Sequence, residues 1–205
     1  MKEEQDAIKD IADIRSMMER SSKFLSLSGL AGVMAGIYAL AGAIIAIKVF
    51  HFRPDWANRQ AEGLSPDLTG ALFTGVAVLM LAVATTIFLS SRKAEKAGEK
   101  IWNATTRRLL EHMFIPLAAG GLLALIMLIN GLIGLIPPIT LIFYGLAIYN
   151  AGRFTFYEVR SLGIIQVILG LIGACCVEYG VLLWALGFGV IHIGYGIYMH
   201  YKYER

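Results

Sequence analysis

Four polar side chains lie deep inside apolar stretches of the sequence, where proton donors and acceptors are costly to place. They are Tyr144, Gln166, His192 and Tyr195. At about 1.5 Å per helical residue, all four lie roughly 9–12 Å from the same end of their helices. Histidine changes charge near neutral pH, so His192 would be the titrating member. The pattern predicts either hydrogen bonds between helices or a site for a substrate, a proton or a lipid headgroup.

Other chemistry-bearing residues form no recognisable site. His112 and His200 fall on different helices and could act as a haem pair, but no second pair supports them. The adjacent Cys175 and Cys176 lack the CxxC spacing of a redox or metal motif, so we interpret them as small packing residues. HExxH, GxSxG, Walker A and paired intramembrane carboxylates are all absent from the sequence. We therefore expect no enzyme, no metal and no cofactor.

The elements that position these residues are predicted from composition. The chain has 205 residues, of which 57% are hydrophobic and 16% charged. About 20 apolar helical residues cross a bilayer, and only helices or closed barrels satisfy their backbone groups in lipid. The long runs do not alternate as barrel strands do. The sequence thus predicts an all-α integral membrane protein with six spans, at 24–50, 68–91, 113–134, 137–152, 161–177 and 179–200.

Two apolar runs are too long for one span and must fold back. Gly134 and the Pro137–Pro138 pair predict a turn in the first, since proline is tolerated in a first helical turn. Glu178–Gly180 interrupts the second and predicts a tight outer turn. A membrane-buried Glu178 is the alternative, and it would be functional by default. The six spans then form three successive helical hairpins.

Positive charge indicates the orientation of the spans. The segments 1–23, 92–111, 153–160 and 200–205 carry 15 of the 18 lysines and arginines. Basic residues favour the cytoplasmic side, so both termini are expected there. We interpret segment 1–23 as a cytoplasmic amphipathic helix and 92–111 as a cytoplasmic helical loop. Either they lie against the membrane and the rest of the protein, or they bind a protein partner. The first apolar run exceeds the length of a signal peptide core, so span one should remain in the mature protein.

Glycine predicts where the helices approach closely. Gly32, Gly36, Gly187 and Gly194 occupy small-residue positions of spans one and six. Small residues let helices pack closely where lipid provides no hydrophobic drive. We expect these glycines to pack the bundle, with assembly of a homo-oligomer as the alternative.

The C-terminal stretch Tyr157–Arg205, above all WALGFGVIHIGYGIYMHYKYER, resembles small uncharacterised bacterial multi-pass inner-membrane proteins. That resemblance implies a location in the bacterial inner membrane and no activity. The expected function is a non-catalytic binding, scaffold or regulatory membrane protein, with a cytoplasmic partner held by 1–23 and 92–111. The alternative is a small oligomeric transporter or channel with a polar site in the inner half of the bilayer. The basic residues of the chain lie in short loops, so nucleic acid is not an expected partner.

Overall fold

The structure is a computed structural model that describes residues 28–52, 65–98 and 101–204. The predicted amphipathic helix at 1–23 lies outside the described residues. Those residues form helices and turns, without a strand in the described ranges. Six segments are long and apolar enough to cross a membrane, as the sequence predicted.

The first five of these segments are regular helices. They are α2 (Gly29–Lys48), α3 (Pro66–Lys96), α4 (Ala104–Ile129), α5 (Ile136–Ala151) and α6 (Tyr157–Cys175), with a short 3₁₀ turn η2 (Ile133–Leu135) before α5. The sixth segment is composite. It consists of the 3₁₀ turn η3 (Val177–Tyr179), α7 (Gly180–Trp184), the π-helix η4 (Ala185–Ile191) and α8 (His192–Tyr203).

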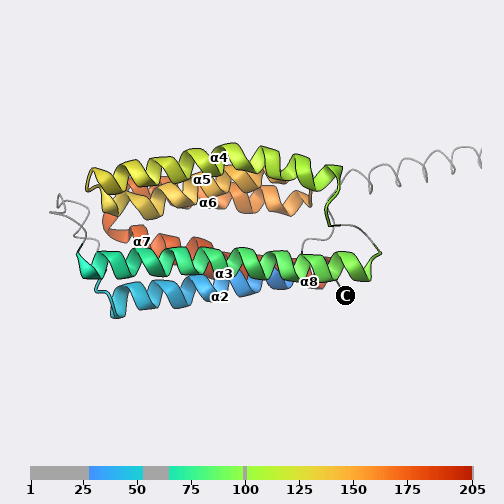
Figure 1. The fold of residues 1–205 in the computed structure, drawn as a ribbon, viewed down its shortest axis with the longest axis horizontal. Coiled ribbons are helices and arrows are strands. Elements are labelled where there is room, and N and C mark those ends of the chain that lie inside the picture. The colour runs from blue at the N-terminus through green and yellow to red at the C-terminus, as the bar shows by residue number, and fades with distance from the viewer. Residues whose placement is uncertain (1–27, 53–64, 99–100, 205) are drawn as a thin grey trace, which may run out of the picture.

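The helices form two groups that the sixth segment joins (Figure 1). In one group α5 packs against α4 and α6, and in the other α2 packs against α3 and α8. The sixth segment starts beside α5 and α6 at α7 and finishes against α2 at α8. The first two predicted hairpins are therefore present. The third opens after its turn, because the backbone of α8 lies closer to α2 than to α6 and contacts α6 mainly through side chains.

One end of the bundle collects the start of α2, the end of α3, the start of α4 and the end of α8. We call it the latch end; it lies at the right of Figure 1, where the C-terminus is marked. The predicted loop helix at 92–111 does not form a separate element among its described residues, 92–98 and 101–111. Its residues extend α3 to Lys96 and begin α4 at Ala104, and Gly98 (φ +69°) stands between them. Asn103 caps α4, since its Oδ1 accepts from the Thr106 amide at 2.8 Å.

The two predicted fold-back points lie at the other end. α4 ends at Ile129, earlier than predicted, because Gly131 adopts a left-handed φ of +73° that glycine tolerates. Pro137 and Pro138 then lie in the first turn of α5, where their missing amides cost no helical hydrogen bond. Glu178 is exposed in the η3 turn, at the predicted position.

Glycines bring backbones into direct contact in both groups. A Cβ on Gly196 would lie 2.6 Å from the Gly29 oxygen, and one on Gly163 would lie 2.7 Å from the Gly145 oxygen. A Cβ on Gly36 would lie 2.7 Å from the Gly189 oxygen, and a Cβ on Gly32 would lie 3.3 Å from the Gly196 Cα. These are the close helix approaches that small residues permit in membrane proteins.

Packing at Gly194 was predicted wrongly. A Cβ there would meet no atom within 4 Å, whereas one on Gly187 would meet Gln166 Oε1 at 2.5 Å. Gly187 faces α5 and α6, whereas Gly189 and Gly196, which are also seven residues apart, both face α2. Gly194 is exposed and points away from the bundle, so spacing alone does not determine which glycines pack.

The glycine pair on α8 gives a matched test. Gly196→Ala should destabilise the folded protein by about 1–3 kcal/mol, because the new methyl must displace the α2 backbone. Gly194→Ala should be neutral or stabilise by up to about 1 kcal/mol, through helix propensity alone. Thermal unfolding in detergent, followed by circular dichroism, measures both. Equal losses in the two variants would contradict the packing of α8 on α2.

Candidate functional site

The deepest polar cluster joins α5, α6 and the sixth segment. Tyr144 comes from α5, Gln166 from the middle of α6, and His192 from the first residue of α8. Gln166 is 0% exposed and His192 5% exposed. We call these three side chains, together with the Gly187 carbonyl, the polar junction. Gln166 and His192, which lie at a similar depth on two spans that the sequence places next to each other, are in contact here, with Nε2 and Nδ1 3.2 Å apart.

The Gly187 carbonyl oxygen is the shared acceptor of the junction. Gln166 Nε2 donates to it at 2.8 Å, and His192 Nδ1 lies 2.9 Å from it. A carbonyl oxygen has two lone pairs and can only accept, so His192 carries its proton on Nδ1. Nε2 therefore accepts from the Tyr144 hydroxyl, at 2.9 Å. Both ring nitrogens are satisfied by neutral groups, and one backbone oxygen ties α6 to the sixth segment.

The local backbone structure lets the Gln166 amide reach the Gly187 carbonyl. Gly187 lies in η4, and a Cβ there would stand 2.5 Å from Gln166 Oε1 and 2.7 Å from Leu141 Cδ2. Only glycine leaves space for the buried amide beside its own carbonyl. π-helical turns are rare and often lie at functional positions.

Apolar and aromatic groups enclose the junction. Phe188 lies over both Tyr144 and His192, with ring centroids 4.9 and 5.7 Å away. On the side away from the latch end, Leu141 and Pro138 are fully buried. Gln166 and His192 thus occupy a dry environment, in which a hydrogen-bonded polar group is far cheaper than an unpaired one.

Tyr195, the fourth predicted residue, is not part of the junction. It packs against the core formed by Ile148, Phe156, Val159, Leu162 and Met199, nearer the latch end. Its hydroxyl is buried without a hydrogen-bond partner among the described residues. The Gln166 Oε1 atom is also buried without a hydrogen-bond partner among the described residues. The structure therefore brings three of the four predicted residues together and places the fourth beside them.

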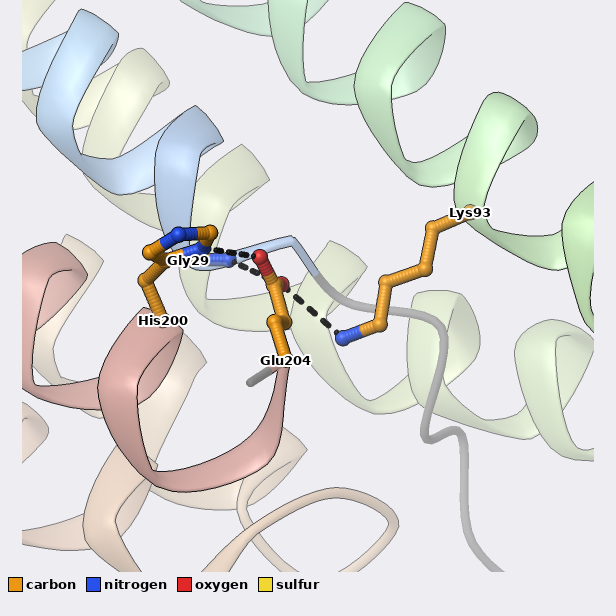
Figure 2. Close-up of polar contacts among 4 residues, drawn as sticks. All are labelled: Gly29, Lys93, His200 and Glu204. Carbon is orange, nitrogen blue, oxygen red and sulfur yellow. Dashed lines mark hydrogen bonds and ion pairs between the residues drawn. The ribbon is translucent and has the colours of Figure 1, made fainter.

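A second polar cluster, which sequence reasoning missed, closes the latch end (Figure 2). Glu204 Oε1 accepts from the Gly29 amide at 2.8 Å and from Lys93 Nζ at 2.9 Å, and its Oε2 lies 2.6 Å from His200 Nδ1. We call these four residues the latch. They connect the start of α2, the end of α3 and the end of α8.

The latch also supplies a cap that α2 lacks locally. Ser28 stands at the N-cap position but makes no side-chain capping bond, and the first turn of α2 holds no acidic residue. Helix N-termini leave amides unpaired and favour negative charge. Glu204 meets both needs from the far end of the sequence.

The pKa of the Glu204 carboxyl reflects this setting. Burial alone would raise it, but the hydrogen bonds from His200, the Gly29 amide and Lys93 outweigh burial and hold the pKa below the ordinary value of 4.5. The carboxylate is therefore charged at neutral pH and stabilises the latch there.

A third set of polar contacts joins the start of α6 to the end of α8, near the latch. Glu158 Oε1, at the start of α6, accepts from Lys202 Nζ and, at 2.9 Å, from the Tyr203 hydroxyl. Its second oxygen, Oε2, is buried without a partner among the described residues. The end of α8 is thus fixed to α6 as well as to α2 and α3.

The remaining candidates take other roles. His200 belongs to the latch, and His112 Nδ1 lies 2.8 Å from the Arg108 carbonyl while its ring packs on Phe154. Cys175 and Cys176 are exposed free thiols. The part of the chain that the structure describes holds no group of three His, Cys, Asp or Glu able to bind a metal.

Comparison of the chain with known protein families, with curated proteins and with solved structures finds no match. The resemblance to bacterial inner-membrane proteins therefore stays a prediction. What the chain does must be argued from the junction and the latch.

The latch predicts an acid-sensitive contribution to stability. Glu204→Gln should lower the free energy of unfolding at neutral pH by about 1–2 kcal/mol, because charge-assisted hydrogen bonds are lost in a partly solvated site. A lowered folded-state pKa means that this contribution is present above pH 4.5 and disappears as the pH falls through the folded value. Wild type and variant should therefore converge in acid, when unfolding is measured across pH.

Glu111→Gln is the matched control. Glu111 pairs with Arg107 at 2.9 Å, but both side chains are largely exposed, so the loss should be small. A difference between wild type and Glu204→Gln that persists unchanged in acid would argue against a charged latch.

Proposed function

We propose that the chain is a multi-pass integral membrane protein of the cell membrane that works without catalysis, as a scaffold or regulator of a protein partner. The latch end would face the cytoplasm. In support, Lys48 is the only described lysine or arginine at the opposite end. The others lie at or near the latch end, where positive-inside bias would place them: Arg92, Lys93, Lys96, Arg107, Arg108, Arg153, Arg160 and Lys202.

The observation that carries this proposal is the enclosure of the polar junction. A transport site needs a route for its solute, and its polar groups must be available to bind it. Gln166 and His192 are instead 0% and 5% exposed. Gln166 of α6 bonds the Gly187 carbonyl of the sixth segment, and His192 bonds the same carbonyl and Tyr144 of α5. Interhelical hydrogen bonds of this kind contribute about 0.6 kcal/mol on average, which suits a packing role.

The start of α4 is the surface we assign to the partner. Trp102 is 68% exposed and Leu110 46% exposed, beside the Arg107–Glu111 pair. With Phe114 and Ile115 they line an open groove of about 520 Å³. Aromatic and charged groups together favour a protein surface over lipid chains. This groove falls at the end of the segment for which the sequence predicted docking.

Quantitative co-purification tests the docking surface. A Trp102→Ala, Leu110→Ala double variant should lose proteins that co-purify with the wild type from its native membranes. Phe73→Ala is the control, since Phe73 is at least as exposed as Trp102 and Leu110 but lies within the apolar part of α3. Identical sets of co-purified proteins from all three chains would contradict the proposal.

A small oligomeric transporter or channel is the second candidate. It is favoured by the π-helix η4 beside His192 and by the buried, unpartnered Gln166 Oε1, a group that a bound solute would satisfy. The outward-facing Gly194 offers a close contact for a second copy.

Flux into proteoliposomes separates the two candidates. Under the scaffold proposal the wild type should pass ions and small solutes no faster than protein-free vesicles. A flux that His192→Ala and Gln166→Ala both abolish, while each variant keeps its helical content and thermal midpoint, would establish the transporter instead.

A further inference from the structure

The turn between α5 and α6 brings together two arginines that no carboxylate neutralises among the described residues. Arg153 and Arg160 take part in none of the ion pairs of that part of the chain, which join other basic residues to Glu111, Glu158 and Glu204. The Arg160 Nε is also buried there without a hydrogen-bond partner. A partly buried arginine normally has an acceptor, so the anion for Arg160 is expected from outside the described protein.

Glu158, two residues before Arg160, does not fill this role. Residues two apart on a helix point to different faces. Glu158 accordingly accepts from Lys202 and Tyr203 of α8, whereas Arg160 lies against α5. The side of α6 that packs on α5 therefore presents Arg160 without a counter-charge among the described residues.

Close packing of α5 on α6 fixes the position of the Arg160 guanidinium. Gly152 leaves room for the stem, because a Cβ there would stand 2.3 Å from Arg160 Cγ and 3.0 Å from the Arg160 amide nitrogen. The Arg160 Cζ then lies 5.4 Å from the centre of the Tyr149 ring. A guanidinium that an aromatic ring supports is held in place with its charge intact. We call Tyr149, Gly152, Arg153 and Arg160 the arginine turn.

Apolar side chains continue from the arginine turn along the outer surface of both helices. Ile164 and Ile168 follow Arg160 at steps of four residues, and both are exposed. Residues at that spacing share one face of a helix. On α5, Leu146 lies three residues before Tyr149 and is exposed as well. A positive charge at the helix end followed by an apolar face matches the headgroup and the acyl chains of an anionic lipid.

We propose that the arginine turn binds the phosphate of an anionic phospholipid, whose acyl chains lie along the exposed faces of α5 and α6. The Arg160 guanidinium suits a phosphate because its planar fork can donate two hydrogen bonds at once. Arg153, exposed beside Gly152, adds a second positive charge. The site presupposes the membrane location proposed above and names the lipid that the protein would select there.

A headgroup with net negative charge fits the arginine turn better than a zwitterionic one. Choline and ethanolamine headgroups carry an ammonium of their own, and Glu158, the acidic residue nearest in sequence, is already bonded to α8. The Tyr149 ring, which might otherwise hold an ammonium on its face, carries Arg160. Each basic residue near a membrane surface strengthens the binding of anionic lipid about fivefold.

Native mass spectrometry of the full-length protein, released from detergent micelles, tests this lipid site. The first molecule of dioleoylphosphatidylglycerol should bind about tenfold more tightly than the first dioleoylphosphatidylcholine. Arg160→Gln should weaken phosphatidylglycerol binding about fivefold and leave phosphatidylcholine binding unchanged. Glutamine keeps the Cγ that packs on Gly152, so the variant should fold, which its thermal unfolding verifies. Equal affinity of wild type and variant for phosphatidylglycerol would overturn the proposal.

Arg92→Gln is the matched control for the charge. Arg92 also lies over an aromatic ring at the latch end, with its Cζ 4.9 Å from the centre of Phe88. Both residues belong to α3 and are exposed, so the Arg92 guanidinium is not fixed between two helices. Its replacement removes the same charge and should leave phosphatidylglycerol binding little changed. A loss equal to that of Arg160→Gln would show only general attraction to a basic surface and would overturn the site.

Competition with glycerol 3-phosphate separates a lipid from a free phosphate. An excess of about a hundredfold should leave the phosphatidylglycerol bound, because the soluble anion buries no apolar surface on α5 and α6. Displacement of the lipid would identify a free phosphate as the ligand and would overturn the proposal. Failure of the membrane location itself would look different, since the chain would then leave its native membranes without detergent. Loss of the lipid site alone would leave partner binding at α4 intact.

Discussion

The arrangement of the sixth segment depends on the hydrogen bonds that the Gly187 carbonyl accepts. This carbonyl accepts from Gln166 of α6 and from His192 of α8, at 2.8 and 2.9 Å. In lipid, where apolar side chains pack equally well against acyl chains, a paired polar group fixes which helices meet and at what depth. A backbone acceptor is available for this because η4 is π-helical and because Gly187 carries no Cβ that would exclude the amide. The junction holds the segment to α5 and α6 at the point where α8 departs toward α2.

The opening of the third hairpin follows from where backbones can touch. α6 is occupied along its length by α5, through the reciprocal Gly145–Gly163 contact. α2 offers a complementary small-residue face to Gly189 and Gly196. Close approach gives many dispersion contacts, each small but large in sum. Because Gly189 and Gly196 face α2, the sixth segment passes from α5 and α6 at its start to α2 at its end, and it joins the two helix groups into one bundle.

The sequence allowed prediction of what depends on local composition and depth. Six apolar segments follow from run length, and the meeting of Gln166 with His192 follows from counting residues inward from each helix end. The side of the sixth segment that each glycine faces could not be predicted from spacing, because it depends on which helix packs there, and so Gly194 was expected inside the bundle. The latch was missed for a different reason: Glu204 lies 111 residues from Lys93 and 175 from Gly29, and nothing local distinguishes it from a solvated terminal charge.

α8 connects the polar junction to the latch. This single helix of 12 residues carries His192 at its first position and His200 near its last, and Glu204 follows it directly. The latch therefore acts on the same rigid element that the junction fixes. Loss of the Glu204 contacts with Lys93 and the α2 amide would release the end of α8, whereas the start of α8 would stay held by the bonds to the Gly187 carbonyl. A partner bound at the latch end would thus act on the same helix that the junction holds, and any coupling between the two places would be reciprocal.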